Sequence, residues 1–530
     1  MASIVRVKVG KHLYLYESIS FRNKEGKPRN HRKPVGKVDK KSGEYIYKQE
    51  YIDRKKAEGI TIAPPKSVPI YSINDLKESS VLQAGSVYLL NGISDNIGLS
   101  KILNEVFGNL SEDIFSLASY LLSSGAPVSY CEDWMNKSDY SNDQVLSSQK
   151  ISKLFNKITE SNIEGFYKSW GDYRAEREYL ALDITSISSW SKLIDDVEWG
   201  YNRDGDKLAQ INLSMLLGLK SRLPIRATVY DGSISDVSTL KTSIKQVASR
   251  LDNPNQLMIV MDKGFSSKKN IDMLLENDNL KFLLALPFTL NFTKKIIEVA
   301  KKNINTFANT IVSGGDIIRG ITLERSWSKG KNVFVHAFYN DIKAAITKNN
   351  LYGYIKKLVT EAELDPENKK LKNHFERYLI IRKSSKRDSG YTIKVKEDVV
   401  ESELKNAGWL VTISNDIDNA SEAIKVYRDK DVVEKGFMRL KNSLGIKRLR
   451  VHSQQAMNSK VFVTFIALIL NSHIHKVMLD NDLYKSMTMK DLIQTMEKLK
   501  VQIINNDRIL YPVSKKQKSI YKFFNVKLPA

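Results

Sequence analysis

"LMIVMDKGF", residues 257–265, begins with an unbroken apolar run and ends with an aspartate and a glycine-containing turn. A short apolar run bounded by a turn is typical of a strand that is buried on both faces. The pattern therefore places Asp262 at the C-terminal end of a buried strand. A carboxylate in that position must be hydrogen-bonded, paired with a cation or bound to a metal ion.

A second acid stands in the same setting upstream. "YLALDITSISS", residues 179–189, is another apolar run, and we expect Asp183 at or near the C-terminal end of its strand. Either acid alone is equally compatible with capping a turn. Two carboxylates at strand ends of one sheet can instead lie side by side and bind a hard divalent cation such as Mg²⁺. The pair favours this second interpretation.

The segments around both acids predict an α/β domain. Further strands are expected over 223–232 and 281–287, and helices over 236–251 and 266–278. Three neighbouring strands followed by alternating helices and strands predict a mixed sheet that is covered by helices.

A third acid lies far downstream, in "VYRDKDVVEKGFMRLK", residues 426–441. Read as one helix, this stretch places Tyr427, Lys430, Glu434 and Lys441 along one stripe. An apolar stripe lies next to it, about 100° around the helix axis. Glu434 thus flanks the buried face and can reach over the end of a sheet. The same stripe is also compatible with a solvated face that carries a Lys430–Glu434 ion pair.

The texture of the sequence changes several times outside this core. Alternating apolar and polar residues, separated by turns, predict strands in the first sixty residues. A helical periodicity follows from about residue 73 to residue 175. The expected divisions are a basic β-rich module (1–65), a helical region (66–177), the first part of the α/β core (178–289), a β-rich insertion with two hairpins (290–405), the last core strand with the glutamate-bearing helices (406–480) and a basic C-terminal tail (481–530).

Composition restricts the classes of function. The chain has 530 residues and a net charge of +23, which favours a polyanionic partner. A positive charge that serves only to keep the protein soluble is the alternative. The surplus is concentrated in residues 1–60, with 16 Lys and Arg against 7 Asp and Glu. The single cysteine, Cys131, excludes an intramolecular disulfide and any multi-cysteine zinc site. The most apolar run, 461–470, is too short to span a bilayer and predicts a buried helix.

Together these segments resemble the DDE transposases of bacterial and archaeal insertion sequences, in the subgroup marked by a Tyr-x2-Arg-x3-Glu-x6-Lys motif. Here the motif consists of Tyr427, Lys430, Glu434 and Lys441, with every spacing kept and lysine in place of arginine. "YLALDITSISS" and "VMDKGFSSKKNI" are similar to the segments around the first and second aspartates of that family. The resemblance covers roughly residues 150–480.

The resemblance implies a fold and a chemistry. The fold would be an RNase H-like, retroviral-integrase-like core with an inserted β-rich subdomain. Asp183, Asp262 and Glu434 would bind two Mg²⁺ ions, for which Mn²⁺ can substitute. The enzyme would cleave strands at the ends of its own element and transfer the 3′-OH ends into target DNA, as in cut-and-paste transposition. The expected partners are double-stranded DNA (the terminal inverted repeats and the target) and a second copy, as a homodimer on DNA, with no membrane and a cytoplasmic, nucleoid-associated location.

The resemblance also implies DNA contacts, with DNA binding by the module of residues 1–65 and DNA-end binding or dimerisation by residues 66–177. Tyr427, Lys430 and Lys441 would bind phosphates near the cleaved bond. The track would extend through the basic segment 447–450, unless that segment is solvated surface, and Trp327 would stack on an unpaired base, unless it packs in the core. The basic side chains of that segment are Lys447, Arg448 and Arg450.

Two other functions remain open. The first is a catalytically inactive or domesticated DNA-binding protein derived from a transposase, which the presence of all three acids argues against. The second is an RNase H-like nuclease that acts on other DNA. Such a nuclease needs no recognition of specific ends, so residues 1–175 discriminate between it and a transposase.

Overall fold

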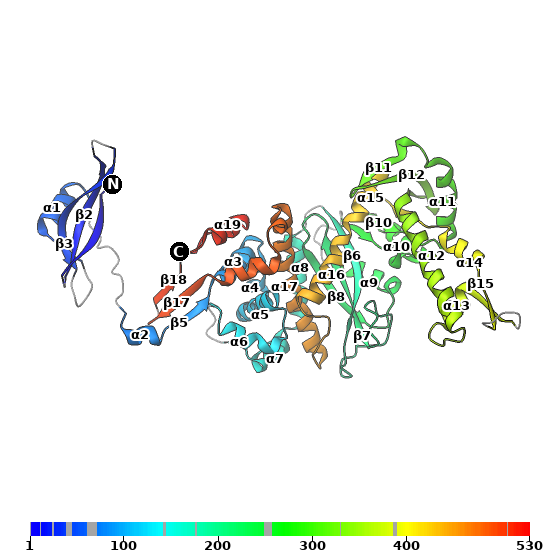
Figure 1. The fold of residues 1–530 in the computed structure, drawn as a ribbon, viewed down its shortest axis with the longest axis horizontal. Coiled ribbons are helices and arrows are strands. Elements are labelled where there is room, and N and C mark those ends of the chain that lie inside the picture. Colours follow the sequence, from blue (N-terminus) through cyan, green and yellow to red (C-terminus); the bar gives the residue numbers. More distant parts are fainter. Residues whose placement is uncertain are drawn as a thin grey trace. The chain divides into compact units, whose positions relative to one another are not determined.

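The computed structural model describes residues 2–10, 12–23, 26–38, 45–60, 71–140, 145–174, 178–248, 257–328, 330–384, 390–505 and 507–529. The chain divides into two compact units (Figure 1). The first contains Met1–Val81 and Val501–Tyr511, and the second contains Leu82–Lys500 and Pro512–Ala530.

The first unit is built on an antiparallel sheet. Leu15, Val35 and Tyr51 form its small core, so its strands and its helix bury one face together. The alternating sequence pattern predicted these strands, whereas the helix α1 was not predicted. Its elements are β1 (Ala2–Val9), β2 (His12–Arg22), β3 (Pro28–Val38), β4 (Tyr45–Tyr47), α1 (Gln49–Ala57), α2 (Ile73–Lys77) and the hairpin of β17 (Lys500–Ile504) and β18 (Asp507–Leu510).

A nine-stranded mixed sheet organises the second unit, which confirms the predicted mixed α/β class. The strands lie in the order β11-β12-β13-β16-β10-β9-β6-β7-β8. Strands β6, β9 and β10 run parallel, and the other neighbours are antiparallel. Their bounds are β6 (Tyr179–Ser188), β7 (Gln210–Gly218), β8 (Pro224–Asp231), β9 (Leu257–Met261), β10 (Leu280–Ala285), β11 (Thr310–Ser313), β12 (Asp316–Ser328), β13 (Lys331–Tyr339) and β16 (Trp409–Ser414).

Helices cover both faces of this sheet. On one face α9 (Asp236–Ala248), α10 (Lys268–Glu276) and α11 (Asn291–Asn303) pack on a core cluster that includes the strand residues Leu182 and Met261. On the other face α15 (Ala420–Asp429) packs with Val260. Successive side chains of a strand point to opposite faces. Asp183 and Asp262, which follow Leu182 and Met261, therefore point to the α15 face.

The region expected as a β-rich insertion, with helices before and between its two hairpins, is less separate from the central sheet than expected. The hairpin of β12 and β13 extends the central sheet, because β13 pairs along its length with β16. Much of the rest is helical, since apolar side chains at helical spacing pack around Leu358 and Phe375. Its elements are α12 (Asp341–Leu364), α13 (Lys372–Tyr378), the two-stranded sheet of β14 (Leu379–Lys383) and β15 (Tyr391–Val395), and α14 (Glu397–Leu404).

The remaining helices of the second unit gather around α17 (Gln454–Asp480), which contains the apolar run 461–470. Among the described residues α17 is the one helix that is long and apolar enough to cross a membrane. However, 78% of its most apolar window is buried inside the structure, as expected of a helix at the centre of a folded domain. The other helices are α3 (Gly85–Asn96), α4 (Leu99–Phe107), α5 (Ser111–Ser124), α6 (Cys131–Met135), α7 (Ser148–Lys157), α8 (Glu160–Tyr173), α18 (Met489–Glu497) and α19 (Lys515–Phe523).

The C-terminal segment 481–530 is not a simple tail. Helices α18 and α19 bury Leu492 and Tyr521, and β17 and β18 form a hairpin. The basic composition concealed the apolar residues that pack these elements.

Candidate functional site: an acid pair beneath a broken helix

The stretch predicted as one helix over 426–441 consists of three pieces. α15 ends at Asp429, α16 spans Asp431–Met438, and a π-helix spans Arg439–Ser443. Lys430 lies at the junction of the first two. The predicted apolar stripe does pack inward, with Val433 and Phe437 buried. Figure 1 shows α15 and α16 crossing one face of the central sheet.

The two aspartates lie on neighbouring parallel strands. β6 pairs with β9 in the register Leu182↔Met261, so Asp183 and Asp262 are the next residues along each strand. We had expected Asp183 at or near the end of its strand, but it lies in the middle of β6. β6 continues to Ser188 because β7 pairs with it along that whole length. The two acids are nevertheless brought to the same place on the α15 face.

Asp183 is held in a largely enclosed position. Its Oδ1 accepts a hydrogen bond of 2.8 Å from the backbone N–H of Ile184. The pKa of Asp183 is raised to about 6, chiefly by burial and to a smaller extent by the charge of Asp262. The hydrogen bond from Ile184 and the charges of Lys430 and Arg203 act in the opposite direction. Ionising this carboxyl near neutral pH is therefore costly unless a cation lies close by.

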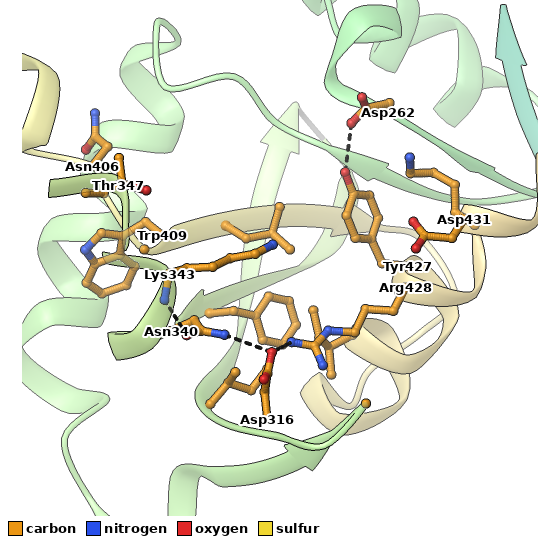
Figure 2. Close-up of a pocket in the computed structure, with 18 of the residues that line it drawn as sticks. Asp262, Asp316, Asn340, Lys343, Thr347, Asn406, Trp409, Tyr427, Arg428 and Asp431 are labelled. Atoms are coloured by element: carbon orange, nitrogen blue, oxygen red, sulfur yellow. Dashed lines mark hydrogen bonds and ion pairs between the residues drawn. The ribbon is translucent and has the colours of Figure 1, made fainter. Parts of the chain in front are cut away.

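Asp262 has a specific partner on α15. The phenol of Tyr427 donates a hydrogen bond of 2.8 Å to its Oδ1 (Figure 2). Burial and the neighbouring charge of Asp262 hold the pKa of Tyr427 well above its usual value. Tyr427 thus remains a neutral donor and fixes one oxygen of Asp262.

Lys430 supplies the positive charge of the site. It is 4% exposed, and its Nζ lies 3.2 Å from Oε1 of Glu434 and 5.4 Å from the ring centre of Tyr427. Burial lowers the pKa of Lys430, but the charges of Asp262 and Glu434 act in the opposite direction and the net pKa is raised. Lys430 is therefore a charged internal counter-ion of the acids. The i,i+4 pair with Glu434, which we considered from the sequence, is present.

The acids do not form a preassembled metal site. Among the residues that the structure describes, no group of three His, Cys, Asp or Glu side chains lies close enough to hold a metal ion. Asp183 and Asp262 form a pair, whereas the side chain of Glu434 is 56% exposed and pairs with Lys430. The possible ligands are carboxylate oxygens, and one of them belongs to Asp183, whose ionised form is stabilised by a nearby cation. This chemistry fits a hard divalent ion.

A cavity of about 1060 Å³ opens beside these residues. Asp262, Tyr427, Glu434, Lys343 and Trp409 are among the residues that line it, and Figure 2 shows Trp409 on the side away from Asp262 and Tyr427. Lys343 and Trp409 were not predicted from the sequence, because they meet only when β16 pairs within the sheet and α12 packs beside it. Their sequence neighbourhood gives no signal of that role.

Arg428 also lines the cavity, next to Tyr427 in the sequence. Its guanidinium donates to the backbone carbonyl of Ser313 and forms an ion pair of 3.3 Å with Asp316. It therefore points toward Asp316, as Figure 2 shows, and helps to hold α15 to the β11–β12 hairpin.

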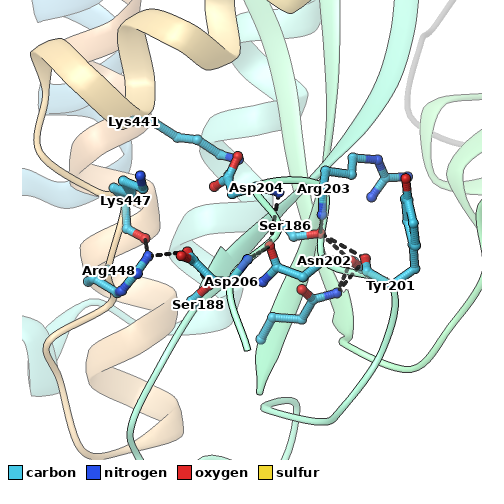
Figure 3. Close-up of polar contacts among 12 residues, drawn as sticks. Ser186, Ser188, Tyr201, Asn202, Arg203, Asp204, Asp206, Lys441, Lys447 and Arg448 are labelled. Atoms are coloured by element: carbon cyan, nitrogen blue, oxygen red, sulfur yellow. Dashed lines mark hydrogen bonds and ion pairs between the residues drawn. The ribbon is translucent and has the colours of Figure 1, made fainter. Parts of the chain in front are cut away.

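The cations expected to contact DNA fall into two groups. Lys430 is already paired with Glu434 at 3.2 Å. Lys441 and Arg448 are likewise paired, with Asp204 at 2.8 Å and with Asp206 at 2.7 Å (Figure 3). Lys447 and Arg450 are exposed. Only the second group is open to a phosphate without a change of partner.

Trp327 has a packing role, which is the alternative to base stacking that the sequence left open. Its ring packs against the core cluster and meets Phe292 edge-on at 5.0 Å between ring centres. Its Nε1 donates a hydrogen bond of 2.7 Å to Asp272. The indole ring and its N–H group thus both have partners within the protein.

The fold and the site define an α/β protein with a carboxylate pair on one face of a mixed sheet, beneath a cationic helix junction. The family described as "Transposase DDE domain" matches residues 174–470, a segment that includes Asp183, Asp262 and Glu434. The chain belongs to this family and is a DNA transposase.

Comparison with other known proteins adds little to this assignment. No curated protein sequence matches the chain. A solved structure described as piggyBac transposase synaptic complex with hairpin DNA is 12% identical, with a TM-score of 0.34 over 84% of this chain and 74% of that chain. A likeness at that level carries no argument.

Proposed function

We propose that this transposase cleaves DNA strands at the ends of its own element and joins the resulting 3′-OH ends to target DNA, in a cut-and-paste reaction. The observation that carries the proposal is the register that sets Asp183 beside Asp262, on the face where α15 and α16 pack. The family match spans both acids and Glu434. In-line phosphoryl transfer needs such oxygen ligands to position divalent ions at the attacking and leaving oxygens.

Asp183, Asp262 and Glu434 would hold the metal, which we propose to be two Mg²⁺ ions per site, with Mn²⁺ as a substitute. When bound, these ions supply the charge that stabilises the attacking and leaving oxygens. Tyr427 keeps Asp262 oriented through its hydrogen bond. Lys430 neutralises the acids and holds Glu434 at the rim of the cavity.

We assign the catalytic core to the RNase H-like class and the chain to the bacterial and archaeal insertion-sequence subgroup. The support is the spacing of Tyr427, Lys430, Glu434 and Lys441 together with the parallel pairing of β6 and β9. Because two ends of an element must be joined in one event, we propose that the protein acts as a homodimer on DNA. Its terminal inverted repeats and its target would be its DNA partners.

The path of the DNA follows the exposed cations. Lys447 and Arg450 lie on the segment that follows the glutamate-bearing helix and are open to phosphates. The basic N-terminal module of residues 1–60 adds a second surface of the same sign. We assign it to binding of the element's ends.

The test is a cleavage assay with the purified chain, Mg²⁺ and a DNA fragment that carries the element's terminus. We expect new 3′-OH ends at the terminus with the parent protein and none with Asp262→Asn. A matched control is Asp272→Asn, an aspartate on α10 that bonds Trp327 outside the site. Equal cleavage by the parent and Asp262→Asn would refute the assignment of the acids.

The same assay separates the alternatives. A nuclease that acts on other DNA would cut fragments with and without the terminus at equal rates. A catalytically inactive, DNA-binding relative would bind the terminus without cutting it in either Mg²⁺ or Mn²⁺.

A further inference from the structure

The turn between β6 and β7 carries two acids that each bind a cation from the chain after Glu434. Both carboxylate oxygens of Asp204 accept hydrogen bonds from Nζ of Lys441, at 2.9 and 2.8 Å. Asp206 pairs with the guanidinium of Arg448 at 2.7 Å. Figure 3 shows the two pairs side by side, with the acids on the strand side and the cations on the helical side.

The turn is held in place by the end of β6 itself. Oδ1 of Asn202 accepts the backbone N–H groups of Asp204 and Asp206, at 2.9 and 3.3 Å. Nδ2 of Asn202 donates to Oγ of Ser188 at 3.0 Å, and that Oγ donates to Asp206 at 3.3 Å. Gly205, between the two acids, has a φ of +71°, which a residue with a side chain rarely adopts. The positions of both carboxylates are therefore set by the strand that carries Asp183.

The paired cations are enclosed. The side chain of Lys441 is 9% exposed and that of Arg448 is 18% exposed, whereas the side chains of Asp204 and Asp206 are 24% and 23% exposed. A DNA phosphate that approached Lys441 would compete with Asp204 for its ammonium. Removing one partner from an enclosed ion pair leaves an uncompensated charge and is strongly unfavourable. The two ion pairs thus join the β6–β7 turn to the segment after Glu434.

Further bonds fix the same segment at its far end. The backbone N–H of Leu449 donates to the carbonyl of Ser188 at 3.2 Å. Nζ of the buried Lys460, on α17, donates to the carbonyl of Leu449 at 2.6 Å. By contrast, α16 lies between a helix junction at Lys430 and a π-helix, so it is bounded by irregular backbone on both sides.

We propose that Asp204 and Asp206 are positioning residues that clamp the chain after Glu434 to the strand that carries Asp183. Lys441 then acts chiefly as the partner of Asp204 and not as a phosphate contact, although the family motif implies the latter. The clamp fixes one end of the segment from which Glu434 reaches the acid pair. Its effect on catalysis rests on the proposed function, whereas its effect on the backbone does not.

The test uses Asp204→Asn, Lys441→Gln, the double variant and the charge-swapped pair Asp204→Lys with Lys441→Asp, all in the full chain. Three quantities are measured: the single-turnover cleavage rate, the salt dependence of DNA binding, and backbone hydrogen exchange over 434–444. We expect each single variant to slow cleavage tenfold or more and to speed exchange, with an unchanged salt slope. The double variant should be no worse than either single variant, and the swap should recover part of the loss.

Lys447→Gln is the matched control, because Lys447 is an exposed cation of the same segment. It should reduce the salt slope by about 0.9, the value for one lost phosphate contact, and leave exchange unchanged. The proposal is overturned if Lys441→Gln reduces the slope in the same way while Asp204→Asn leaves exchange as in the parent. If the parent protein does not cleave, the proposed function fails, but the exchange data still decide whether the clamp exists.

Discussion

Lys430 sets the electrostatics of the acid pair. It stands where the family motif has arginine, and it is buried at the junction between α15 and α16. An ammonium is a compact point charge, whereas a guanidinium is a wide planar fork. The lysine can therefore lie among Asp183, Asp262 and Glu434 and interact with all three, as the causes of its raised pKa show.

Replacing Asp183 should separate stability from activity. Between its ordinary pKa and its folded value of about 6, the folded protein binds a proton that the unfolded chain does not. Asp183 therefore makes the protein less stable as the pH rises through this window. In metal-free buffer, Asp183→Asn should raise the free energy of unfolding at pH 8 by up to about 3 kcal/mol, because about 1.4 kcal/mol corresponds to one pKa unit.

Urea denaturation at pH 4 and pH 8 measures this effect. The gain should shrink to about half a kcal/mol at pH 4, where the parent carboxyl is protonated in the folded state and partly protonated in the unfolded chain. Cleavage by the variant should be absent at both pH values. A gain of equal size at pH 4 would show that ionisation of Asp183 is not its cause.

Tyr427→Phe removes one hydroxyl and no ring packing. Because a hydrogen bond to a charged group is worth about 1.5–3 kcal/mol, we expect a loss of stability of that size at neutral pH. Asp262 would also lose its fixed orientation, so cleavage should fall with little change in DNA affinity. Tyr352→Phe, at a half-exposed position on α12, is the control and should change neither quantity.

At the scale of the element, α16 tolerates a side chain at its glycine. A Cβ at Gly436 would meet Leu217 at 3.4 Å and Met215 at 3.9 Å, which are ordinary contacts. Because glycine in a helix costs about 1 kcal/mol relative to alanine, Gly436→Ala should stabilise α16 and slow hydrogen exchange over 431–438.

Gly85→Ala is the counterpart on α3. There a Cβ would lie 2.2 Å from the backbone carbonyl oxygen of Met496, so the substitution should lower the melting temperature. Destabilisation by Gly436→Ala to the same extent would contradict the packing described around α16.

The order of helices and strands was predictable from hydrophobic pattern, and the acid pair followed from it. Apolar runs identified β6, β9, β10 and β16, and the hairpins β12–β13 and β14–β15 were expected as such. The pairing of β13 with β16 was not, because sheet order depends on contacts between residues far apart in the chain. For this reason the insertion was expected to be more separate than it is.

The site was predictable in its acids and not in its partners. Asp183, Asp262 and Glu434 follow from strand and helix patterns together with motif spacing. The partners Asp204 and Asp206 lie in a polar loop whose residues look solvated, and their role depends on a contact with residues more than two hundred positions away. The break at Lys430 was also invisible, because helix propensity is continuous across it.

For the whole molecule, the division into two units predicts independent behaviour of the N-terminal module. Residues 2–60 have a core of their own around Leu15. A chain that begins at residue 71 should unfold with a midpoint within a few degrees of the parent by calorimetry. Its DNA binding should weaken at low salt with a shallower salt slope, since the module carries 16 Lys and Arg against 7 Asp and Glu. An unchanged slope would mean that the module does not contact DNA.

The internal counter-ion at Lys430 has a consequence for the life of the newly made protein. Because its ammonium partly balances the buried acids, we expect the chain to fold without a metal ion. Small metalloproteins whose ligands repel one another collapse only when the ion arrives. Here, folding and metal loading are separate events, so a chelator should leave the thermal midpoint within about 2 °C of its value without chelator, while Lys430→Met should lower it. The protein would then remain folded but inactive until divalent ions and a DNA end are present together.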